Sequence, residues 1–291
     1  MSIVGQSIVG QVYKELVYGG HLLSIGTASI AASASLVLER TPTFDLLAMA
    51  YLFSLGAYTV NRISDFEMDR ISHPDRTAYL ERRKFSLPYL AFMCFAAGYA
   101  LALVRNAYFF AGLLVPLALA IVYSVGSPSM NRILGFSRLK EGLLVKNVVV
   151  SFGWSLIPVL VGLYYLDIPV ALLAFCPFIF LRLMVNTIFF DARDIAADEA
   201  AGVKTIPGTI GIKNAWLIMD VLDIAAMVMV VALAFGGVLP FYTASLAVFT
   251  PYSLAYRYYS LRSDLHKDSL RDLAADGEYL LWGFVASLGQ I

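Results

Sequence analysis

Long apolar runs separated by short polar stretches dominate this sequence. A helix needs about 20 mainly apolar residues to cross a bilayer, and nine segments of the chain meet that requirement. They cover approximately residues 20–38, 42–63, 86–104, 107–125, 143–166, 168–190, 214–236, 238–256 and 276–291. The pattern predicts an all-α, polytopic membrane protein with nine transmembrane helices, folded as a single domain over residues 1–291.

The composition agrees with this pattern. Of the 291 residues, 59% are hydrophobic and 14% are charged, and the mean hydropathy is +0.74. Ordinary soluble domains contain roughly 25% charged residues, so a soluble protein is the weaker interpretation. The formal net charge is zero, and the chain therefore has no strongly basic character that would indicate a nucleic-acid partner.

The distribution of Lys and Arg predicts how the segments are oriented. Arg40 and Arg105 lie in the loops after the first and third segments, and Arg182 lies within the sixth. The other 18 of the 21 basic residues lie near the N-terminus or in and beside the loops that follow the even-numbered segments. Because cytoplasmic loops are enriched in Lys and Arg, we expect a cytoplasmic N-terminus and cytoplasmic even-numbered loops.

A row of polar side chains ends the second apolar segment. Asn61, Asp65 and Asp69 follow one another at intervals of four residues in the run NRISDFEMD. Residues four apart lie on nearly the same face of a helix, so the three side chains are expected to form one stripe. Such groups are costly to place beside lipid, and their oxygen atoms are the ligands that Mg²⁺ prefers.

A second acidic run ends the sixth segment. Asp191, Asp194 and Asp198 occur in DARDIAAD, and the predicted topology places them on the same cytoplasmic side as the first run. Helices two and six, which carry the two runs, are four crossings apart, a hint of a four-helix pseudo-repeat. Because Mg²⁺ combines a few carboxylates with waters and phosphate oxygens, the two runs predict a shared site for Mg²⁺ and a phosphate-bearing substrate.

A structural role is the alternative for these acids, as solvated helix ends or as ion-pair partners. The neighbouring cations available for such pairs are Arg62, Arg70 and Arg193. A similar choice exists for Arg182, which either binds a ligand or forms an intramembrane salt bridge to Asp220 or Asp223.

Basic residues close to the acids are expected to bind a diphosphate, although some of them serve only to fix the topology. Breaking the C–O bond to a diphosphate leaves negative charge on the departing group, which cations stabilise. The residues expected to bind it, together with Asn61 and Tyr123, are Arg76, Lys140, Lys146, Arg193 and Lys204.

Aromatic side chains are expected to form the apolar part of the site. An isoprenoid tail can lie between helices with its diphosphate at the cytoplasmic end, and aromatic faces can stabilise an allylic cation. Packing against lipid is the alternative for any one of these rings. The residues concerned are Phe53, Tyr58, Tyr123, Trp154, Phe178, Phe180, Phe189 and Phe190.

Taken together, the motifs resemble those of the UbiA superfamily of intramembrane prenyltransferases. The resemblance rests on Asn61-x-x-x-Asp65-x-x-x-Asp69, on Asp191-x-x-Asp194-x-x-x-Asp198, and on Gly202-x-x-Thr205-x-Pro207 with Gly211. It extends over nearly the whole chain through the number and order of the helices. The resemblance implies a central cavity among nine helices, capped by cytoplasmic loops over residues 64–85, 126–142 and 191–213.

The resemblance also implies Mg²⁺-dependent ionisation of a prenyl diphosphate and attack by an acceptor. The metal ligands that it implies are Asn61, Asp65, Asp69, Asp191, Asp194 and Asp198, and the catalytic residues among them are Asp65, Asp69, Asp194 and Asp198. The chain departs from the family pattern at two positions. Arg62 stands where many members have Asp, and Ser127 stands where many have a Lys four residues after the equivalent of Tyr123. Possible replacements for that lysine are Arg132, Arg138, Lys140 and Lys146.

The sequence therefore predicts an integral membrane prenyltransferase with active-site loops on the cytoplasmic side. Its donor is expected to be a prenyl diphosphate, from geranyl to geranylgeranyl or longer, and its acceptor a lipophilic molecule. An aromatic ring, as in quinone precursors, is slightly favoured over the hydroxyl of a glycerol-phosphate lipid. A terpene cyclase and a cation transporter are the alternatives. The transporter is disfavoured because the acids gather at helix ends and not at the membrane midplane.

Overall fold

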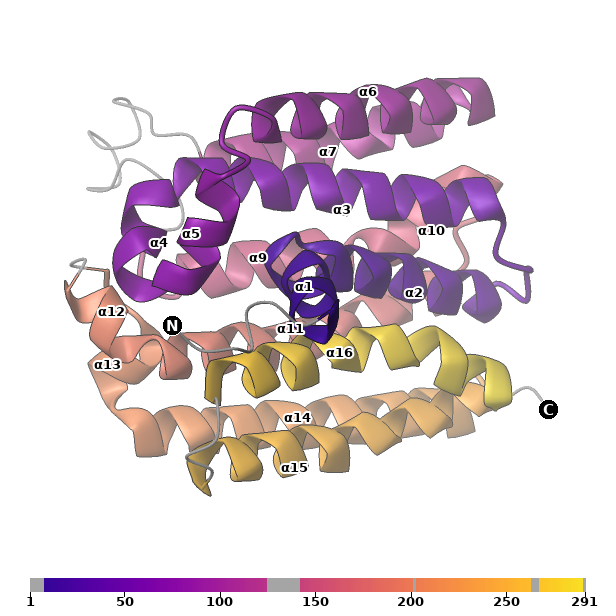
Figure 1. Cartoon of the computed structure of the whole chain (residues 1–291). Coiled ribbons are helices and arrows are strands. Elements are labelled where there is room, and N and C mark those ends of the chain that lie inside the picture. The colour runs from indigo at the N-terminus through magenta and orange to yellow at the C-terminus, as the bar shows by residue number, and fades with distance from the viewer. Residues whose placement is uncertain (1–7, 125–141, 201–202, 263–266, 290–291) are drawn as a thin grey trace.

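The computed structural model describes residues 8–124, 142–200, 203–262 and 267–289. Every regular element in these ranges is a helix, which confirms the all-α prediction. Figure 1 shows long helices lying side by side, with α6 and α7 at one edge of the bundle and α14 and α15 at the other. The short helices α4, α5, α12 and α13 gather at one end of the long ones (Figure 1).

The long helices are α2 (His21–Val37), α3 (Phe44–Ser64), α6 (Leu87–Arg105), α7 (Ala107–Ser124), α9 (Val145–Ser155), α10 (Ile157–Tyr165), α11 (Val170–Arg193), α14 (Ile212–Phe235), α15 (Phe249–Arg262) and α16 (Lys267–Leu288). The short ones are α1 (Ile8–Tyr13), the π-helix η2 (Lys14–Tyr18), α4 (Phe66–Ser72), α5 (Pro74–Glu81), α12 (Ile195–Ala200), α13 (Ile206–Ile210) and the 3₁₀-helix η4 (Phe241–Val248).

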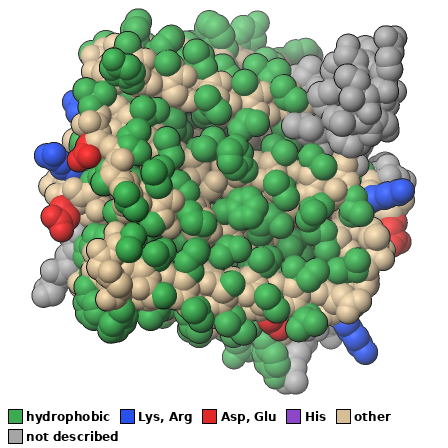
Figure 2. All heavy atoms as spheres, turned by 180° about the vertical axis from the view of Figure 1, so that it is seen from behind, with side chains coloured by type: hydrophobic (Ala, Val, Ile, Leu, Met, Phe, Trp, Pro, Cys, Tyr) green, Lys and Arg blue, Asp and Glu red, His purple; other side chains and the backbone are tan. Residues whose placement is uncertain are grey.

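Several of these helices are long and apolar enough to cross a bilayer. By length and composition, four spans in the described part of the chain qualify: α6, the α9–α10 pair, α11 and α14. A fifth is added if the first turns up to Tyr18 and α2, which are bent by 58°, count as one span. The back of the molecule is covered by hydrophobic side chains, with the visible charges mostly at its margins (Figure 2). These observations support a polytopic membrane protein without establishing nine crossings.

Prolines break two segments that were expected to be continuous helices. The segment over 143–166 divides into α9 and α10 just before Pro158, and the segment over 238–256 divides into η4 and α15 just before Pro251. Proline has no N–H to donate to the carbonyl four residues earlier, so it favours the first turn of a new helix. The last helix also differs from expectation, because α16 begins at Lys267 and not near residue 276.

The first long helix packs closely against the last one through small side chains. The Cα of Gly26 lies so near α16 that a Cβ added there would be 3.0 Å from the Cβ of Tyr279. One turn further on, the Ser29 hydroxyl donates to the carbonyl of Leu280 and accepts from the backbone N–H of Gly283. The serine-, glycine- and alanine-rich sequence of α2 therefore serves close helix–helix packing, as is typical of membrane bundles.

A buried cluster of charges joins α11, α14, α15 and α16. The Arg182 guanidinium donates to both carboxylate oxygens of Glu278 at 2.6 Å and pairs with Asp223. Arg257 pairs with Asp223 as well, and it reaches Asp220 at 3.0 Å. The alternative of an intramembrane salt bridge for Arg182 is thereby confirmed for Asp223, whereas Asp220 pairs with Arg257.

Removing the cation at the centre of this cluster should destabilise the fold. Arg182→Met leaves Glu278 buried without its cation and Asp223 with Arg257 alone, so we expect the free energy of unfolding to fall by about 3–5 kcal/mol. Chemical or thermal unfolding in detergent micelles measures the change. The control is Arg70→Gln, since the Arg70 side chain is half exposed and should contribute less than about 0.5 kcal/mol. Equal stability of Arg182→Met and the parent would contradict this account.

Candidate active site

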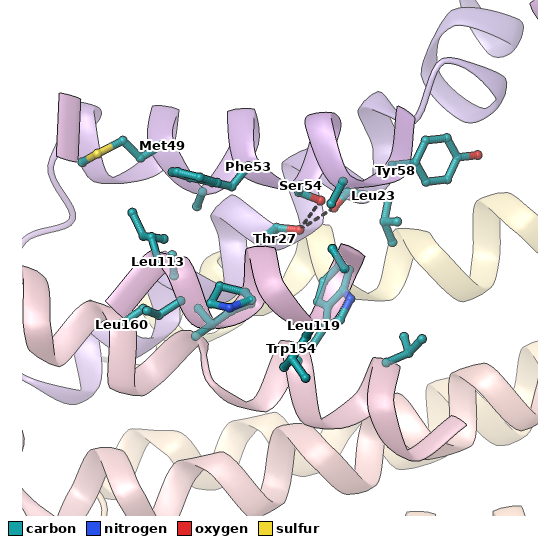
Figure 3. A pocket seen from close by; sticks show the side chains of 18 of the residues that line it. Leu23, Thr27, Met49, Phe53, Ser54, Tyr58, Leu113, Leu119, Trp154 and Leu160 are labelled. Atoms are coloured by element: carbon teal, nitrogen blue, oxygen red, sulfur yellow. Dashed lines mark hydrogen bonds between the residues drawn. The ribbon is translucent and has the colours of Figure 1, made fainter. Parts of the chain in front are cut away.

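An apolar cavity of about 300 Å³ lies among α2, α3, α7, α9 and α10. Figure 3 shows its lining, with Met49, Phe53 and Tyr58 following one another along α3 and Leu113, Leu160 and Trp154 across from them. Nearly all the lining side chains are aliphatic or aromatic. Only a few polar groups reach it, among them the hydrogen-bonded hydroxyls of Thr27 and Ser54 (Figure 3). The cavity therefore suits an extended hydrocarbon chain.

Three helices bring polar side chains to one end of this cavity. On α3 the lining residues Phe53, Ala57 and Asn61 repeat every four positions, and on α7 the lining ends at Tyr123. On α9 the lining residues Val150 and Gly153 share a helix face with Lys146. The helical period thus continues each apolar lining into a polar group at the same end of the bundle.

The first acidic motif is held by two arginines. Asp69 is 9% exposed, and its two carboxylate oxygens accept separately from Arg62 and Arg76, each at 3.0 Å. Burial raises the pKa of the Asp69 carboxyl, but the two guanidinium groups more than offset this and hold its pKa below the usual range. Asp65 lies at the break between α3 and α4, where its backbone N–H donates to the Asn61 carbonyl.

The second motif begins with a buried carboxylate that uses both of its oxygens. Asp191 is 2% exposed, and it accepts from the Lys146 ammonium at 2.6 Å and from the Asn147 amide at 2.8 Å. Lys146 also lies 3.9 Å from Asp198. The consecutive residues Lys146 and Asn147, both on the first turn of α9, are therefore fixed by one acidic side chain of α11.

The other two aspartates of this motif have opposite electrostatic environments. Asp194 accepts from Arg193 through both oxygens at 2.6 Å and lies 3.4 Å from the His73 ring. Burial alone would raise the pKa of Asp194, but His73 and Arg193 hold it well below its usual range. Burial raises the pKa of Asp198 to about 6, and the nearby carboxylates add to this rise although Lys146 opposes it.

The fold brings the two motifs into one cluster. His73, just after the first motif, contacts Asp194 of the second, and Arg193 lies 3.5 Å from the same imidazole. Arg193 also pairs with Asp272 on α16, a residue that the sequence analysis did not select. A signal was present, because Asp268, Asp272 and Asp276 repeat every four residues, as the first motif does.

Not every residue predicted for the site lies in this cluster. Lys140 falls outside the described residues, together with Arg132, Arg138 and Ser127. Lys204 is exposed after α12 and makes no ion pair with a described residue. Among the other family positions, Thr205 caps α13 by accepting from the backbone N–H of Gly208.

Two buried oxygen atoms in this region have no hydrogen-bond donor among the described residues. They are Oδ1 of Asn61 and Oδ2 of Asp198, and both are the hard oxygen ligands that Mg²⁺ takes. In the part of the chain that the structure describes, no three acidic, histidine or cysteine side chains form a ready-made metal site. The residues therefore fit a Mg²⁺ ion that is held partly by phosphate oxygens and water.

Comparison with known proteins identifies the class of this molecule. The model of the UbiA prenyltransferase family matches residues 22–275, which is most of the chain. The chain therefore belongs to the UbiA prenyltransferase family, and it is a membrane enzyme that transfers prenyl groups. This family membership excludes the cation transporter as the general class.

Two curated relatives and one solved structure show how near the similarity is. The chain is 25% identical over 212 residues to the digeranylgeranylglyceryl phosphate synthase of Sulfurisphaera tokodaii, covering 72% of each protein. It is 30% identical over 192 residues to that of Thermococcus kodakarensis, covering 64% of this chain and 63% of the relative. A UbiA homologue of Archaeoglobus fulgidus bound to GPP and Mg²⁺ shares the fold, with a TM-score of 0.65 and 15% identity, over 94% of this chain and 99% of that one.

Narrowing the apolar cavity should change which prenyl donors are accepted. A Cβ added at Gly153 meets no atom within 4 Å, so Gly153→Leu should fold normally while its side chain projects into the cavity. Residue 153 lies about 10 Å along the axis from Lys146, which is deeper than a five-carbon chain extends from the polar end. We expect the KM for a 20-carbon donor to rise at least about tenfold, with little change for dimethylallyl diphosphate. Steady-state kinetics with donors of both lengths measures this, with Gly277→Leu on α16, which also has open space, as the control. An unchanged ratio between the donors would show that the tail lies elsewhere.

Proposed function

We propose that this enzyme transfers a prenyl group from a prenyl diphosphate to a hydroxyl of a glycerol-phosphate lipid. The observation that carries the donor half is the apolar cavity whose polar end lies at Asn61 and Tyr123, beside the acidic motifs. The acceptor half rests on the similarity to proteins named digeranylgeranylglyceryl phosphate synthase. The aromatic acceptor that was slightly favoured from the sequence becomes the second candidate.

The prenyl tail is proposed to lie in the apolar cavity, with its diphosphate at the polar end. In the transfer, the acceptor oxygen forms a bond to the allylic carbon, and the bond from that carbon to the diphosphate oxygen breaks. The diphosphate leaves with the electron pair of that bond, and the hydroxyl proton passes to water or to the departing diphosphate. An apolar lining keeps water from competing with the acceptor for the allylic carbon.

Mg²⁺ is the proposed cofactor, and it would neutralise charge that develops on the leaving diphosphate. Asn61, Asp65 and Asp198 are the residues proposed to hold it, supported by the buried oxygens of Asn61 and Asp198 that have no hydrogen-bond donor among the described residues. The other acids of the two motifs each use both oxygens on protein side chains, which are basic except for the Asn147 amide on Asp191, so they would join the metal only by exchanging those partners. They are Asp69, Asp191 and Asp194.

Lys146 is proposed to replace the lysine that many family members carry four residues after Tyr123. It continues the cavity-lining face of α9 at its polar end, and Asp191 fixes its ammonium group. From this position it can donate to a diphosphate oxygen, as can Arg76 and Arg193 in the same cluster.

We further propose that the whole site faces the cytoplasm and that the chain crosses the membrane nine times, as the charge distribution predicts.

The function is tested by product analysis of the full chain in lipid nanodiscs with geranylgeranyl diphosphate and Mg²⁺. Three reactions are compared: with a prenyl glyceryl ether bearing a phosphate, with a hydroxybenzoate, and with no acceptor. Transfer to the glyceryl phosphate is the expected result. Transfer to the hydroxybenzoate alone would favour the aromatic candidate, and cyclic products without an acceptor would indicate a terpene cyclase.

Removing one proposed metal ligand should reduce both metal binding and turnover. Asp198→Asn keeps the size of the side chain but removes its charge, so we expect the turnover to fall at least about 100-fold. Electron paramagnetic resonance of Mn²⁺, titrated in the presence of diphosphate, should show weaker metal binding. The control is Glu67→Gln, whose side chain is 79% exposed on α4. Normal Mn²⁺ affinity in Asp198→Asn would remove this residue from the metal site.

Loss of the Lys146 charge should weaken binding of the leaving group. For Lys146→Met we expect inhibition by inorganic diphosphate to weaken at least about tenfold, since a buried charge-assisted contact is lost. Lys146→Arg keeps the charge and should retain more of the affinity. Diphosphate inhibition constants measure the effect, and a Lys146→Met enzyme inhibited as strongly as the parent would contradict the role of this residue.

A further inference from the structure

A second cavity, of about 230 Å³, lies on the other side of α3 from the apolar one. It is enclosed by η2, the first turn of α2, the end of α3, α5 and the start of α6. Its lining is polar toward α3 and apolar toward α6, unlike that of the first cavity. Its lining includes Glu15, Tyr58, Arg62, Arg83, Leu87 and Leu90.

The end of α3 separates the two cavities. Successive residues of a helix point about 100° apart, and the first cavity is lined by Asn61 whereas the second is lined by Arg62. Tyr58, one turn earlier, lines both cavities. Its ring packs on the backbone of Gly20, where φ is +82° and an added Cβ would lie 2.4 Å from the ring. Only glycine allows this contact, so the Tyr58 ring is held in place where the two cavities adjoin.

Arg62 brings a positive charge to the second cavity. It shares the Asp69 carboxylate with Arg76, so this group of three side chains carries a net charge of +1. The Arg62 side chain is 17% exposed and stacks over the Tyr58 ring, with its guanidinium carbon 4.5 Å from the ring centre. Its Nε is buried and has no hydrogen-bond acceptor among the described residues. An anionic group in the cavity would accept a hydrogen bond from this Nε and would neutralise the net positive charge.

The rest of the lining resembles the surroundings of an amphiphile. Arg83 pairs with Glu15 at the wall opposite α3, and both side chains are nearly half exposed. Leu87 and Leu90 form the edge along α6, and the neighbouring side chains of Tyr89 and Met93 are exposed on that helix. A molecule in this cavity can therefore hold a charged head beside Arg62 while its apolar part leaves along α6 toward lipid.

We propose that this second cavity binds the anionic headgroup of the acceptor, a phosphate monoester on a lipid. Arg62 is its main cation, and Arg83 is a second one, released from Glu15 when the phosphate enters. The inference rests on the proposed function and adds a separate site for the second substrate. In this arrangement Asn61 binds the donor, and the adjacent Arg62 binds the headgroup of the acceptor. The reacting hydroxyl meets the allylic carbon beside the Tyr58 ring.

Kinetics of Arg62 and Arg83 variants test the proposal, using the full chain in nanodiscs with the phosphate-bearing lipid acceptor and its dephosphorylated alcohol. The parent enzyme should prefer the phosphate-bearing acceptor at least about tenfold in kcat/KM. Arg62→Gln should abolish this preference and raise the acceptor KM at least about tenfold. Arg62→Lys should recover part of it, and Arg83→Gln, which does not touch the acidic motifs, should raise the same KM to a smaller extent. Inorganic phosphate, tested as a competitor, distinguishes a lipid headgroup site from a site for the free ion.

Two further measurements separate the possible failures. The dissociation constant of the donor should stay within about threefold of the parent in Arg83→Gln, with Arg70→Gln as the surface control. In the Arg62 variants the donor affinity should fall less than the acceptor affinity, since Arg62 also holds Asp69. Unchanged acceptor KM values in both Arg62→Gln and Arg83→Gln would overturn the inference, as would a donor affinity that falls as much as the acceptor affinity. Strong competition by free phosphate with no preference between the two lipids would overturn it too. If the parent enzyme uses neither lipid, the proposed function fails as well, which the product analysis shows independently.

Discussion

Every charge that enters this apolar bundle has to be compensated, and the architecture follows from that requirement. An unpaired charge in a low-dielectric interior costs several kcal/mol, whereas a well-bonded ion pair is tolerated. Far from the cavity, Arg182 and Arg257 are balanced by acids on neighbouring helices. At the cavity end the acids also lie beside basic side chains, while Asn61 and Asp198 keep buried oxygens without a hydrogen-bond donor among the described residues. The unsatisfied atoms of the two clusters differ in kind, because they include oxygens at the cavity end, whereas they are the guanidinium nitrogens Nε and Nη1 of Arg257 in the structural network.

The same requirement explains why the acids of the site are paired with basic side chains. Asp69, Asp191 and Asp194 each hold basic side chains in fixed positions, so the acids act largely through the cations that they orient. A polyanionic substrate entering such a cluster exchanges one set of charge partners for another, without exposing a bare charge to the membrane interior. Two substrates of the same sign can be held close together only if each has cations of its own, and the proposed second site would meet this condition on the other side of α3.

The sequence was sufficient to predict an all-helical fold and the proximity of the two acidic motifs, for reasons that lie in helical geometry. The four-residue spacing of the acids predicts that they share one face of a helix. The distribution of Lys and Arg predicts that both motifs lie on the same side of the membrane. The sequence did not predict which side chains pair between helices, because these pairs depend on how each helix is rotated in the bundle. Thus the partner of Arg182 was narrowed to two acids and found to be Asp223, while Glu278 was not foreseen. The breaks before Pro158 and Pro251 were missed because hydropathy averages ignore the missing N–H. The second cavity was missed because its walls come from five separate elements.

The adjacency of Asn61 and Arg62 has a consequence for how this enzyme can change over evolutionary time. Because one turn of α3 lines both cavities, inserting or deleting a single residue earlier in α3 would rotate both side chains by about 100°. The linings of both cavities would then be disrupted together. Loops tolerate such length changes, but this helix end does not. A point substitution at residue 62, in contrast, would change the lining of the second cavity and one of the two cations that hold Asp69. The arginine that departs from the common family pattern therefore stands where the second cavity meets the first acidic motif.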